Sequence, residues 1–390
     1  MRTQVGIVGA GPAGLLLSHL LHLEGIESVV IEARSRAYVE ERVRAGVLEQ
    51  GSVDLLNASG VGERMRKEGL THEGIELLFN HQRHRINFRD LTGGKCVTVY
   101  GQQEVVKDLI EARLMSGGEI VFEAQDVAVQ GLESERPSIE FREGERTHRL
   151  ECDFIAGCDG FHGICRPAIA SALRFYEREY PSAWLGILAQ AKPASEELIY
   201  ARHEHGFALL SMRSPAVTRL YLQCAPDEDL ANWPDSRIWE ELQIRLHSGG
   251  GFRVEEGPIL QKGITPMRSF VAEPMQSGRL FLAGDAAHIV PPTGAKGMNL
   301  AMADVSLLAR ALRSHYAHGN QQQLAAYSQT CLRRVWRVQH FSYWMTSLFH
   351  RADNAFEFRR QTAELNGLVS SRAAAQYLAE NYIGLPLDPP

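Results

Sequence analysis

The sequence predicts a mixed α/β (α+β) fold in which a βαβ unit carries an inserted antiparallel sheet and a C-terminal helical region. Three observations lead to this prediction. Short apolar runs at 5–8 and 28–32 flank a helical apolar pattern, which is typical of parallel strands joined by a helix. Polar and apolar residues alternate over 73–99, and 180–265 is rich in strand-like runs. From 295 to about 360 the pattern is mainly helical.

The composition indicates an ordered globular chain and excludes one class of partner. The chain has 390 residues, of which 44% are hydrophobic and 23% are charged, and these shares are typical of folded proteins. A chain of this length exceeds one ordinary core, so we expect two or three interlocked domains. The formal net charge of -6 provides no basic face, so we expect no nucleic-acid partner.

Neither a membrane segment nor a metal site is expected. The most apolar helical stretch, residues 15–23, is too short to span a bilayer. The first predicted strand begins close to Met1, which leaves no room for a signal peptide. The 6 cysteines show no C-x-x-C pair and no zinc-type spacing, so we expect free thiols in a reducing compartment. We therefore expect a cytoplasmic protein.

A glycine-rich turn joins the first predicted strand to the following helix. Residues 9–14 read Gly-Ala-Gly-Pro-Ala-Gly, and the second strand ends on the acidic Glu32. In this context Gly9 permits a tight turn, Gly11 lets the backbone approach a pyrophosphate, and Gly14 allows close packing of helix and strand. Glu32 is placed to accept hydrogen bonds from a ribose. The pattern predicts a dinucleotide site, allows FAD or NAD, and has an ordinary glycine-rich turn as its alternative.

Two later segments favour FAD over NAD. Asp159 and Gly160 follow a short apolar run, with Arg166 downstream, and resemble the Asp-Gly motif of flavoprotein monooxygenases. Another apolar run precedes Gly284 and Asp285, which resemble a Gly-Asp motif whose aspartate binds the FAD ribityl chain. A strand that ends in this way delivers one carboxylate to a polyol at the carboxyl edge of a sheet. Either segment taken singly is also compatible with a capped turn.

A proline-containing loop, residues 289–301, follows Asp285 and runs into a predicted helix. The N-terminus of that helix would present partial positive charge to the pyrimidine edge of a flavin and favour its anionic reduced form. The alternative is a connection stiffened by proline. Because the loop adjoins the predicted ribityl site, we favour the functional interpretation.

These motifs extend into a resemblance that covers residues 1–386. On five segments the chain resembles the single-component flavin aromatic hydroxylases, namely 42–50, 97–102, 156–163, 281–301 and 380–386. The expected architecture is a Rossmann-like FAD-binding βαβ domain with an inserted antiparallel-sheet substrate domain and a C-terminal helical region. Because no linker separates the strand-rich pieces, we expect discontinuous domains: FAD-binding at 1–72, 98–178 and 267–345, substrate-domain strands at 73–97, the substrate-binding sheet at 179–266, and a helical interface region at 346–390.

The resemblance implies a definite reaction. NAD(P)H would reduce a tightly but non-covalently bound FAD, O2 would form a flavin C4a-hydroperoxide, and this electrophile would convert 4-hydroxybenzoate to 3,4-dihydroxybenzoate. Because a phenolate is more electron-rich than a phenol, the site must remove the phenolic proton and exclude water. A hydroxylase for 3-hydroxybenzoate or salicylate is one alternative, and a non-catalytic flavin redox sensor is another. Members of the family are commonly dimers, so we expect a homodimer.

The resemblance also implies which residues bind the substrate. Arg213 would pair with the substrate carboxylate, since a guanidinium fork matches it, and Ser211 and Tyr221 would add hydrogen bonds. The backbone carbonyl of Pro292 would accept a hydrogen bond from the substrate phenol. From sequence alone, a Ser-x-Arg pair on a strand is more typical of a solvated edge.

A proton relay is implied by the same resemblance. Tyr200 would take the phenolic proton and pass it to Tyr382, and His72 would connect the relay to solvent, since the ordinary pKa of histidine lies near the operating pH. Taken singly, Tyr200 is more typical of a half-buried core tyrosine and His72 of a surface histidine.

The remaining cofactor contacts come from the resemblance too. Those expected for the flavin, besides the motifs above, are Arg42, Arg44, Gln102, Arg219, which would influence the swing of the flavin, and Asn299. Those expected for the nicotinamide dinucleotide are Arg34, Tyr38, Arg42, His162 and Arg268. Ala33 stands where NADPH-specific members have arginine, although Arg36 is placed to compensate. We expect NADPH, and NADH use stays open.

Overall fold

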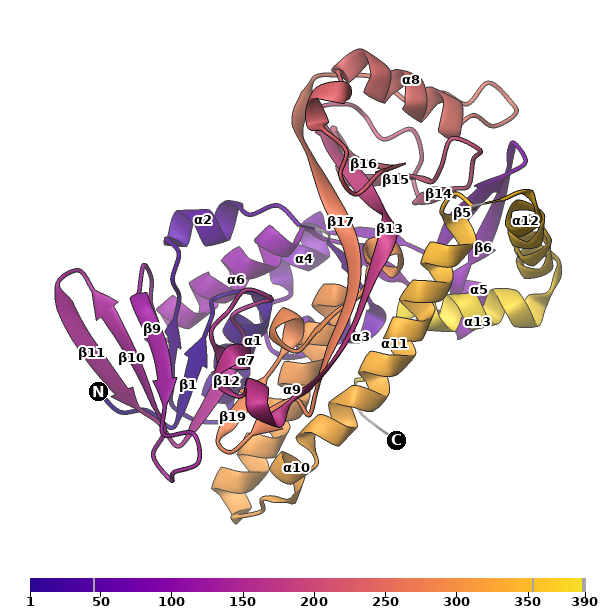
Figure 1. Cartoon of the computed structure of the whole chain (residues 1–390). Coiled ribbons are helices and arrows are strands. Elements are labelled where there is room, and N and C mark those ends of the chain that lie inside the picture. The colour runs from indigo at the N-terminus through magenta and orange to yellow at the C-terminus, as the bar shows by residue number, and fades with distance from the viewer. Residues whose placement is uncertain (45, 353, 388–390) are drawn as a thin grey trace.

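The computed structural model describes residues 1–44, 46–352 and 354–387 (Figure 1). Residue 45, within the segment 42–50, and residues 353 and 388–390, within the predicted C-terminal region, lie outside the described residues. The predicted mixed α/β fold is confirmed, with a parallel sheet at the N-terminal end of the chain and a large antiparallel sheet beside it. Within the described part of the chain, no helix is long and apolar enough to cross a membrane.

A six-stranded sheet forms the first half of the molecule and collects strands from distant parts of the chain. Its order is β18-β19-β12-β1-β2-β8, and every pair is parallel except β18 with β19. These strands are β1 (Val5–Val8), β2 (Ser28–Ile31), β8 (Glu119–Val121), β12 (Phe154–Gly157), β18 (Gln276–Ser277) and β19 (Leu280–Leu282). The four central strands are buried throughout, as their continuous apolar runs predict.

Three helices pack around the centre of this sheet. Helix α1 (Pro12–Leu23) contacts both α6 (Gln102–Met115) and α9 (Gly297–His318). Their apolar side chains and those of the sheet form one buried cluster. A three-stranded meander adjoins it, formed by β9 (Gln125–Gln130), β10 (Ser138–Glu143) and β11 (Arg146–Glu151).

An eight-stranded sheet forms the other half, with the order β20-β17-β13-β16-β15-β14-β5-β6. Its strands are β5 (Gly74–Phe79), β6 (Gln82–Asn87), β13 (Arg174–Ala189), β14 (Ile199–Ala201), β15 (Ala208–Ser214), β16 (Val217–Cys224), β17 (Ile259–Glu273) and β20 (His288–Ile289). The two long strands β13 and β17 run from one half of the molecule to the other (Figure 1). Residues 178 and 266, the expected domain limits, therefore lie inside continuous strands.

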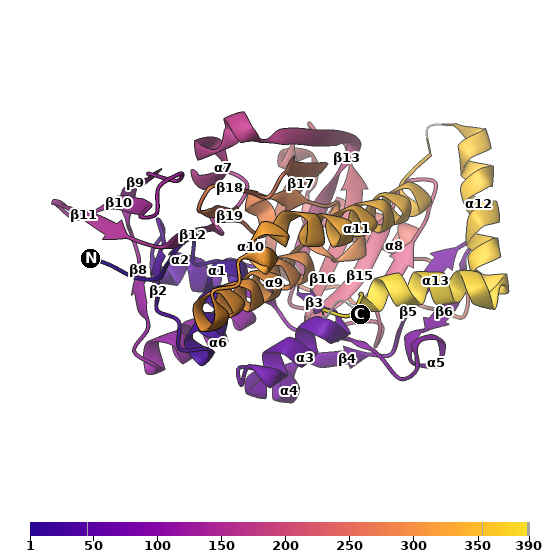
Figure 2. The same ribbon diagram turned by 90° about the horizontal axis from the view of Figure 1, so that it is seen from below.

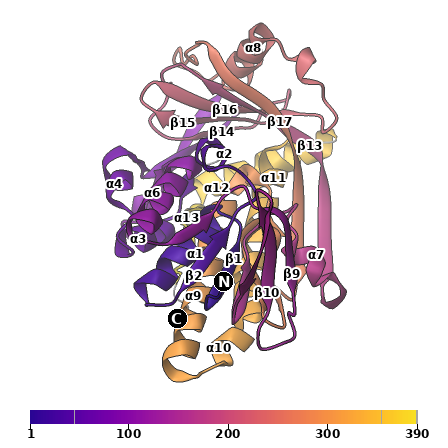
Figure 3. The same ribbon diagram turned by 90° about the vertical axis from the view of Figure 1, so that its left-hand side faces the viewer.

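One helix was not foreseen in the strand-rich region 180–265. Helix α8 (Asp235–Arg245) covers the outer face of the large sheet, where Ile238, Trp239 and Leu242 join a separate apolar cluster. Their spacing of one, three and four residues is helical, and a proline precedes the first turn. Figure 3 shows α8 at the end of the molecule opposite α10 (Gln322–Ala325).

Small elements connect the two halves. A three-stranded sheet has the order β3-β7-β4, with β3 (Val47–Leu48), β4 (Leu70–His72) and β7 (Val97–Val99). The short helices are α2 (Arg36–Glu41), α3 (Gln50–Ala58), α4 (Glu63–Glu68), α5 (Phe88–Thr92) and α7 (Cys165–Ala168). Leu48 pairs with Thr98 as part of β3, and α3 begins two residues after it.

The C-terminal helices cover the junction of the two halves. Helix α11 (Tyr327–Phe349) runs along the molecule, and α12 (Ala355–Ser370) and α13 (Arg372–Ile383) turn back beneath β5 and β6 (Figure 2). Helix α13 contacts α5 and β6. Side chains from α11, α12 and α13 join those of the large sheet in a second apolar cluster. The end of the chain therefore closes the core that holds the predicted substrate residues.

Candidate active site

The glycine turn between β1 and α1 has the geometry of a phosphate-binding loop. Gly9 has a φ of 105°, and a Cβ there would lie 2.4 Å from the carbonyl oxygen of Cys158. A Cβ on Gly14 would lie 2.0 Å from the carbonyl oxygen of Gly9. Around Gly11 there is no atom within 4 Å of a Cβ position, so open space faces the start of the helix. This space and the free N–H groups suit a pyrophosphate.

Glu32 ties the end of β2 to this turn. Its Oε2 accepts a hydrogen bond from the backbone N–H of Ala10 at 2.7 Å, and its Oε1 accepts one from the N–H of Arg34 at 2.7 Å. Each carboxylate oxygen keeps a further lone pair. Glu32 can therefore bind ribose hydroxyls while its orientation is fixed by the backbone.

Asp285 lies in a crevice at the carboxyl end of β19. Its side chain is accessible to solvent although protein surrounds it closely. Burial raises the pKa of this carboxyl group, and the charges of His288, Arg44 and Arg42 act in the opposite direction. An accessible carboxylate beside two arginines matches the predicted contact with a polyol.

A buried ion pair supports the turn that carries Asp285. His288 Nε2 lies 2.7 Å from Asp304 Oδ2, and both side chains are almost fully buried. The same Asp304 oxygen accepts the backbone N–H of Gly284 at 3.0 Å. Burial alone would lower the pKa of His288, but the carboxylates of Asp304 and Asp285 raise it. The sequence analysis gave no role to His288 or to Asp304, which lies on α9.

Asp304 gives a testable prediction for cofactor retention. Asp304→Asn removes the charge that balances His288 and weakens the acceptor for Gly284, so the turn bearing Asp285 loses its support. Breaking one partner of a buried pair costs about 3–5 kcal/mol, and we expect FAD to dissociate at least tenfold more readily. The measurement is the FAD content and dissociation constant of the purified protein. Asp126→Asn, an exposed aspartate on β9, is the control, and equal FAD affinity in both variants would contradict the assignment.

Arg166 connects the two aspartate motifs. Its guanidinium donates to the carbonyl oxygen of Ala286 at 3.0 Å and to that of Phe161. Asp159 Oδ2 accepts the N–H of Cys165 at 2.8 Å, while Oδ1 is buried without a partner among the described residues. Burial raises the pKa of Asp159. The structure thus brings the motifs at 159 and 285 together through one side chain.

The predicted nicotinamide residues form two groups. The guanidinium carbons of Arg34 and Arg42 lie 5.5 and 5.8 Å from the ring centre of Tyr38. His162 and Arg268 both lie against the ring of Phe161, at 5.1 and 5.0 Å between centres. Gln102 is the first residue of α6.

Arg36, which was expected to compensate for Ala33, forms an ion pair within its own helix. Arg36 Nε pairs with Glu40 at 2.7 Å within α2. The pair is exposed, and such pairs are worth little in energy. Breaking this pair to bind a phosphate would therefore cost little free energy, although Arg36 is not preorganised to bind one.

On the large sheet, the predicted carboxylate ligands lie on neighbouring strands. Ser211 faces Arg219 in the register of β15 and β16, and Arg213 and Tyr221 lie two residues further along their strands. Gly186 on β13 leaves room for Arg219, because a Cβ there would lie 2.9 Å from its guanidinium. Alternation puts Ser211, Arg219 and Tyr221 on one face, and Arg213, which lies at a shift of register between Met212 and Ser214, is near enough to Tyr221 for their charges to interact.

Arg213 is a partly buried cation with an enclosed Nε and without an anionic partner among the described residues. Its Nη1 donates to the carbonyl oxygen of Met212 at 2.9 Å, and its Nε has no partner. Burial lowers the pKa of Arg213. For Tyr221, burial would raise the pKa, but the guanidiniums of Arg213 and Arg219 outweigh it and lower the pKa. This positive, enclosed site favours a carboxylate.

The two predicted relay tyrosines form a direct hydrogen bond. The hydroxyl oxygens of Tyr200 on β14 and Tyr382 on α13 are 2.7 Å apart, although the residues are 182 positions apart in the chain. Both side chains are 1% exposed. Burial raises the pKa of both hydroxyls. The pair is thus neutral, and either hydroxyl can donate to the other.

His72 is brought into the same core but is not hydrogen-bonded to it. It is 1% exposed, and neither ring nitrogen has a partner among the described residues. Burial lowers its pKa to about 4, while the charge of Glu197 acts in the opposite direction. The expectation that the pKa of His72 lies near neutrality is wrong, because desolvation favours the neutral ring.

The loop after Asp285 is held by a buried polar cluster. Asn299 Oδ1 accepts the N–H of Glu49 at 2.9 Å, and its Nδ2 donates to the carbonyl oxygen of Val47 at 2.9 Å. Lys296 Nζ donates to Glu49 Oε1 at 2.6 Å and to the carbonyl oxygen of Tyr382 at 2.8 Å. Asn299 therefore positions backbone, and the Lys296–Glu49 pair, which sequence reasoning missed, attaches α13 to this loop.

The predicted carbonyl of Pro292 lies in the same loop. It accepts the N–H of Ala295 at 2.9 Å, which closes a short turn at Pro292–Gly294. A carbonyl oxygen has a second lone pair, so a phenol can still bind there. Helix α9 then begins at Gly297, as the proline-containing loop predicts.

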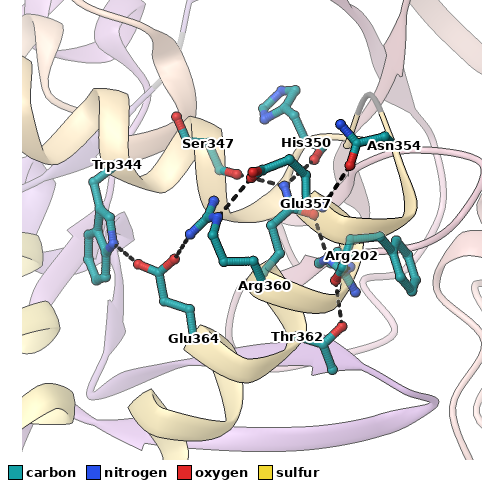
Figure 4. A network of polar contacts seen from close by, with 11 residues as sticks. Arg202, Trp344, Ser347, His350, Asn354, Glu357, Arg360, Thr362 and Glu364 are labelled. Carbon is teal, nitrogen blue, oxygen red and sulfur yellow. Dashed lines mark hydrogen bonds and ion pairs between the residues drawn. The ribbon is translucent and has the colours of Figure 1, made fainter.

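A network behind Tyr200 fixes its strand to the C-terminal helices (Figure 4). Arg202 Nε donates to Gln361 Oε1 at 3.0 Å, and its guanidinium carbon lies 3.8 Å from the ring centre of Phe358. Gln361 Nε2 in turn donates to the carbonyl oxygen of His350 at 2.9 Å. The His350 ring accepts from Trp184 Nε1 at 2.7 Å. Strands β13 and β14 are thereby locked to the end of α11.

Two buried histidines predict how stability depends on pH. Burial lowers the pKa of both His72 and His350 to about 4, below the ordinary 6.5. Between these values the unfolded chain binds more protons, so the free energy of unfolding falls as pH falls from 6.5 to 4, by about 3 kcal/mol per histidine. Urea unfolding at several pH values measures the slope. His350→Phe should reduce it and the exposed His22→Phe should not; an unchanged slope in His350→Phe would contradict this.

The cofactor implied by the dinucleotide motifs fits the residues present. The open space at Gly11, the fixed carboxylate of Glu32 and the accessible Asp285 offer a pyrophosphate, a ribose and a polyol site in turn. Arg44 lies near enough to Asp285 for their charges to interact, and Arg219 Nε is buried without a partner among the described residues. Within the same residues no group of three or more His, Cys, Asp or Glu side chains is placed to hold a metal ion.

A family model described as an FAD binding domain matches residues 2–342. The chain belongs to the FAD-binding-domain family. FAD is therefore the dinucleotide of the glycine motif, and NAD is excluded from it. The chain is 48% identical to p-hydroxybenzoate hydroxylase of Acinetobacter baylyi, over 100% of this chain and 96% of that protein.

Two more distant proteins are also similar to this chain. Rifampicin monooxygenase of Rhodococcus hoagii is 24% identical over 77% of this chain and 62% of its own length. The crystal structure of p-nitrophenol 4-monooxygenase from Pseudomonas putida superposes with a TM-score of 0.85 at 18% identity, covering 97% of both chains. The fold of the FAD-binding-domain family thus extends over the whole chain, including the large sheet and the C-terminal helices.

Proposed function

We propose that this protein hydroxylates 4-hydroxybenzoate at the 3-position to give 3,4-dihydroxybenzoate, using O2 and NAD(P)H with FAD as the resident cofactor. The observation that carries the proposal is the combination of Arg213, a partly buried cation with an unpartnered Nε, with the hydroxyl pair Tyr200–Tyr382 in the core under the same sheet. Arg213 would bind the carboxylate of the substrate, and the tyrosine pair would accept the proton of its phenol. The 48% identity to p-hydroxybenzoate hydroxylase along the full chain supports the same substrate.

Binding begins at the carboxylate. Arg213 supplies a guanidinium whose Nε is free, and Ser211 and Tyr221 supply neutral donors on the same sheet face. The lowered pKa of Tyr221, caused by the two guanidiniums against the effect of burial, makes its hydroxyl a stronger hydrogen-bond donor. A carboxylate in this position also neutralises a buried positive charge.

The phenol is activated by proton transfer. Tyr200 accepts the phenolic proton at its hydroxyl and donates its own to Tyr382, so the aromatic ring becomes electron-rich. The pair is enclosed by Phe88, Phe207 and Phe349, whose rings exclude water from the transfer path. The carbonyl of Pro292 is available to orient the phenol. Tyr382 in turn gives up a hydroxyl proton toward solvent, so both tyrosines stay neutral and the negative charge stays on the substrate.

FAD, when bound, supplies the redox and oxygen chemistry. The residues that would hold it are Gly9, Gly11, Gly14, Glu32, Arg42, Arg44, Gln102, Asp159, Gly160, Arg219, Asp285 and Asn299. Asn299 acts through the backbone that it fixes, and Asp159 through the turn that Arg166 joins to Ala286. Arg34, Tyr38, His162 and Arg268 would contact NADPH. We favour NADPH over NADH because Arg34 and Arg42 gather at Tyr38 in spite of Ala33.

Three further points belong to the proposal. We infer the discontinuous domain plan given above, with the limits at 178 and 266 falling within β13 and β17. A homodimer is inferred from the resemblance, with the exposed aromatic side chains of the C-terminal helices, such as Tyr343 and Phe356, suited to an interface. A cytoplasmic location is supported by the 6 cysteines, all of which are free.

A steady-state assay of the FAD-loaded protein tests the proposed function. We expect 4-hydroxybenzoate to accelerate NADPH oxidation and to yield 3,4-dihydroxybenzoate. Salicylate and 3-hydroxybenzoate serve as matched acids. If either is turned over in preference to 4-hydroxybenzoate, it replaces 4-hydroxybenzoate as the proposed substrate. Bound FAD without any substrate-stimulated oxidation would favour a flavin redox sensor. Repeating the assay with NADH decides the coenzyme.

A further inference from the structure

An ion pair lies beside the histidine at the far end of the tyrosine relay. Arg85 on β6 binds Glu197 through two hydrogen bonds of 2.7 Å each. Glu197 directly precedes the segment that leads into β14, and its Oε2 lies 3.2 Å from the Cβ position of Gly74, which is two residues after His72. The guanidinium carbon of Arg85 lies 3.3 Å from the same point. The pair therefore covers the start of β5 next to His72.

The relay leads toward the same place. The ring of Tyr382 stacks on that of Phe88 at 5.0 Å, and the backbone N–H of Phe88 donates to the carbonyl oxygen of Glu73 at 2.7 Å. His72 is thus adjacent in the chain to Glu73, whose carbonyl oxygen binds Phe88, and Phe88 packs against Tyr382 of the relay. Both of its ring nitrogens are buried and without partners among the described residues. A proton that leaves Tyr382 in this direction meets a ring that has to carry positive charge in an apolar setting.

The charged and titratable groups around His72 come from several elements. Glu73 follows it in the chain and pairs with Arg89 of α5 in an exposed ion pair. Cys96 precedes β7, the strand that pairs with His72, and Tyr382 belongs to α13. Glu197 is the group whose charge acts on His72 against the effect of burial. Its side chain is 13% exposed, whereas Arg85 is 42% exposed.

We propose that Glu197 is a positioning residue for proton release: its carboxylate stabilises the positive charge that His72 carries while a proton passes through, and Arg85 weakens this effect by pairing with it. The inference rests on the proposed function, because it needs a substrate that gives up a phenolic proton. His72 receives the proton on one ring nitrogen and releases one to solvent, so no bond other than N–H and O–H changes. Glu197 therefore favours proton release, and Arg85, its partner in the ion pair, opposes it.

The test is proton release on substrate binding, followed in stopped flow with a pH indicator dye and the FAD-loaded protein in weak buffer. Glu197→Gln should slow release by about threefold to tenfold, since one unit in the pKa of His72 changes the protonated population tenfold. Arg85→Gln should accelerate release, because the carboxylate is no longer neutralised. Glu197→Asp, which keeps the charge, should restore a rate close to wild type.

The controls separate this role from structural support. Arg83→Gln breaks the neighbouring pair with Glu76 on the same hairpin and should leave the rate unchanged. A loosened hairpin would slow release in all of these variants, so slowing in both Glu197→Gln and Arg85→Gln overturns the proposal. In a His72→Asn background the effect of Glu197→Gln should vanish, and its persistence would also overturn it.

Failure of the proposed function gives a different result. If wild-type protein releases no proton with 4-hydroxybenzoate and forms no product, the proposed function fails and this inference fails with it. If the wild type does both and the two variants match it, the inference alone is wrong. FAD content, measured on every variant, confirms that the folded protein is being compared.

Discussion

Arg213→Ala is expected to abolish practical binding of 4-hydroxybenzoate while leaving FAD in place. The guanidinium is a partly buried cation whose enclosed Nε is without a partner and which has no anionic partner among the described residues. Its removal leaves the substrate carboxylate buried without a counter-charge, which costs about 2–5 kcal/mol, or roughly 30-fold to several-thousand-fold in Kd. Titration of the flavin absorbance with 4-hydroxybenzoate measures this loss.

Two comparisons make the result for Arg213 specific. Arg213→Lys keeps the charge but loses the fork, so its affinity should fall between those of the wild type and the alanine variant. Phenol has no carboxylate, so its weaker binding should be nearly the same in all three proteins. Wild-type affinity for 4-hydroxybenzoate in Arg213→Ala would move the carboxylate site elsewhere.

The second large effect is expected from Tyr200→Phe. The variant keeps the ring in the core but loses the hydroxyl that bonds Tyr382 at 2.7 Å. Substrate binding through Arg213 should persist, while hydroxylation should slow by about a hundredfold, the lower end of what a positioned proton acceptor contributes. The ratio of 3,4-dihydroxybenzoate to hydrogen peroxide formed per NADPH consumed should fall with it, because an unactivated ring reacts too slowly.

The relay partner provides the matched test. Tyr382→Phe breaks the same hydrogen bond, so the double variant should be little worse than either single one. Tyr327→Phe is the control, since this buried tyrosine donates to the carbonyl oxygen of Leu282 in the other half of the molecule. Unchanged coupling in Tyr200→Phe would remove that residue from proton transfer.

Local signals in the sequence were enough to predict the FAD-binding half. The glycine turn, Glu32 and the Gly284–Asp285 pair each follow an apolar run that the structure confirms as a strand, and the family match confirms the cofactor. Each of these signals depends on residues within one βα or strand–turn unit. Short-range spacing is then sufficient, because the strand end and the helix start fix the geometry.

The substrate half could not be derived in this way. Tyr200 and Tyr382 are far apart in the chain, and their hydrogen bond depends on how α13 packs against the sheet. Only the resemblance to a known family predicted that Tyr200 and Tyr382 act together. The buried pairs Lys296–Glu49 and His288–Asp304 escaped notice, because neither member stands out at its own position. Helix α8 was missed because strand-like runs surround it.

Helix α13 has a consequence for the synthesis of this protein. It supplies Tyr382, and its backbone binds the Lys296 ammonium, so a helix that follows β1 to β20 in the chain completes the relay. The FAD-binding strands β1 and β2 are translated first, but they pair with β12 and β19 from much later segments. A growing chain therefore has neither a finished sheet nor a working relay until α13 has emerged.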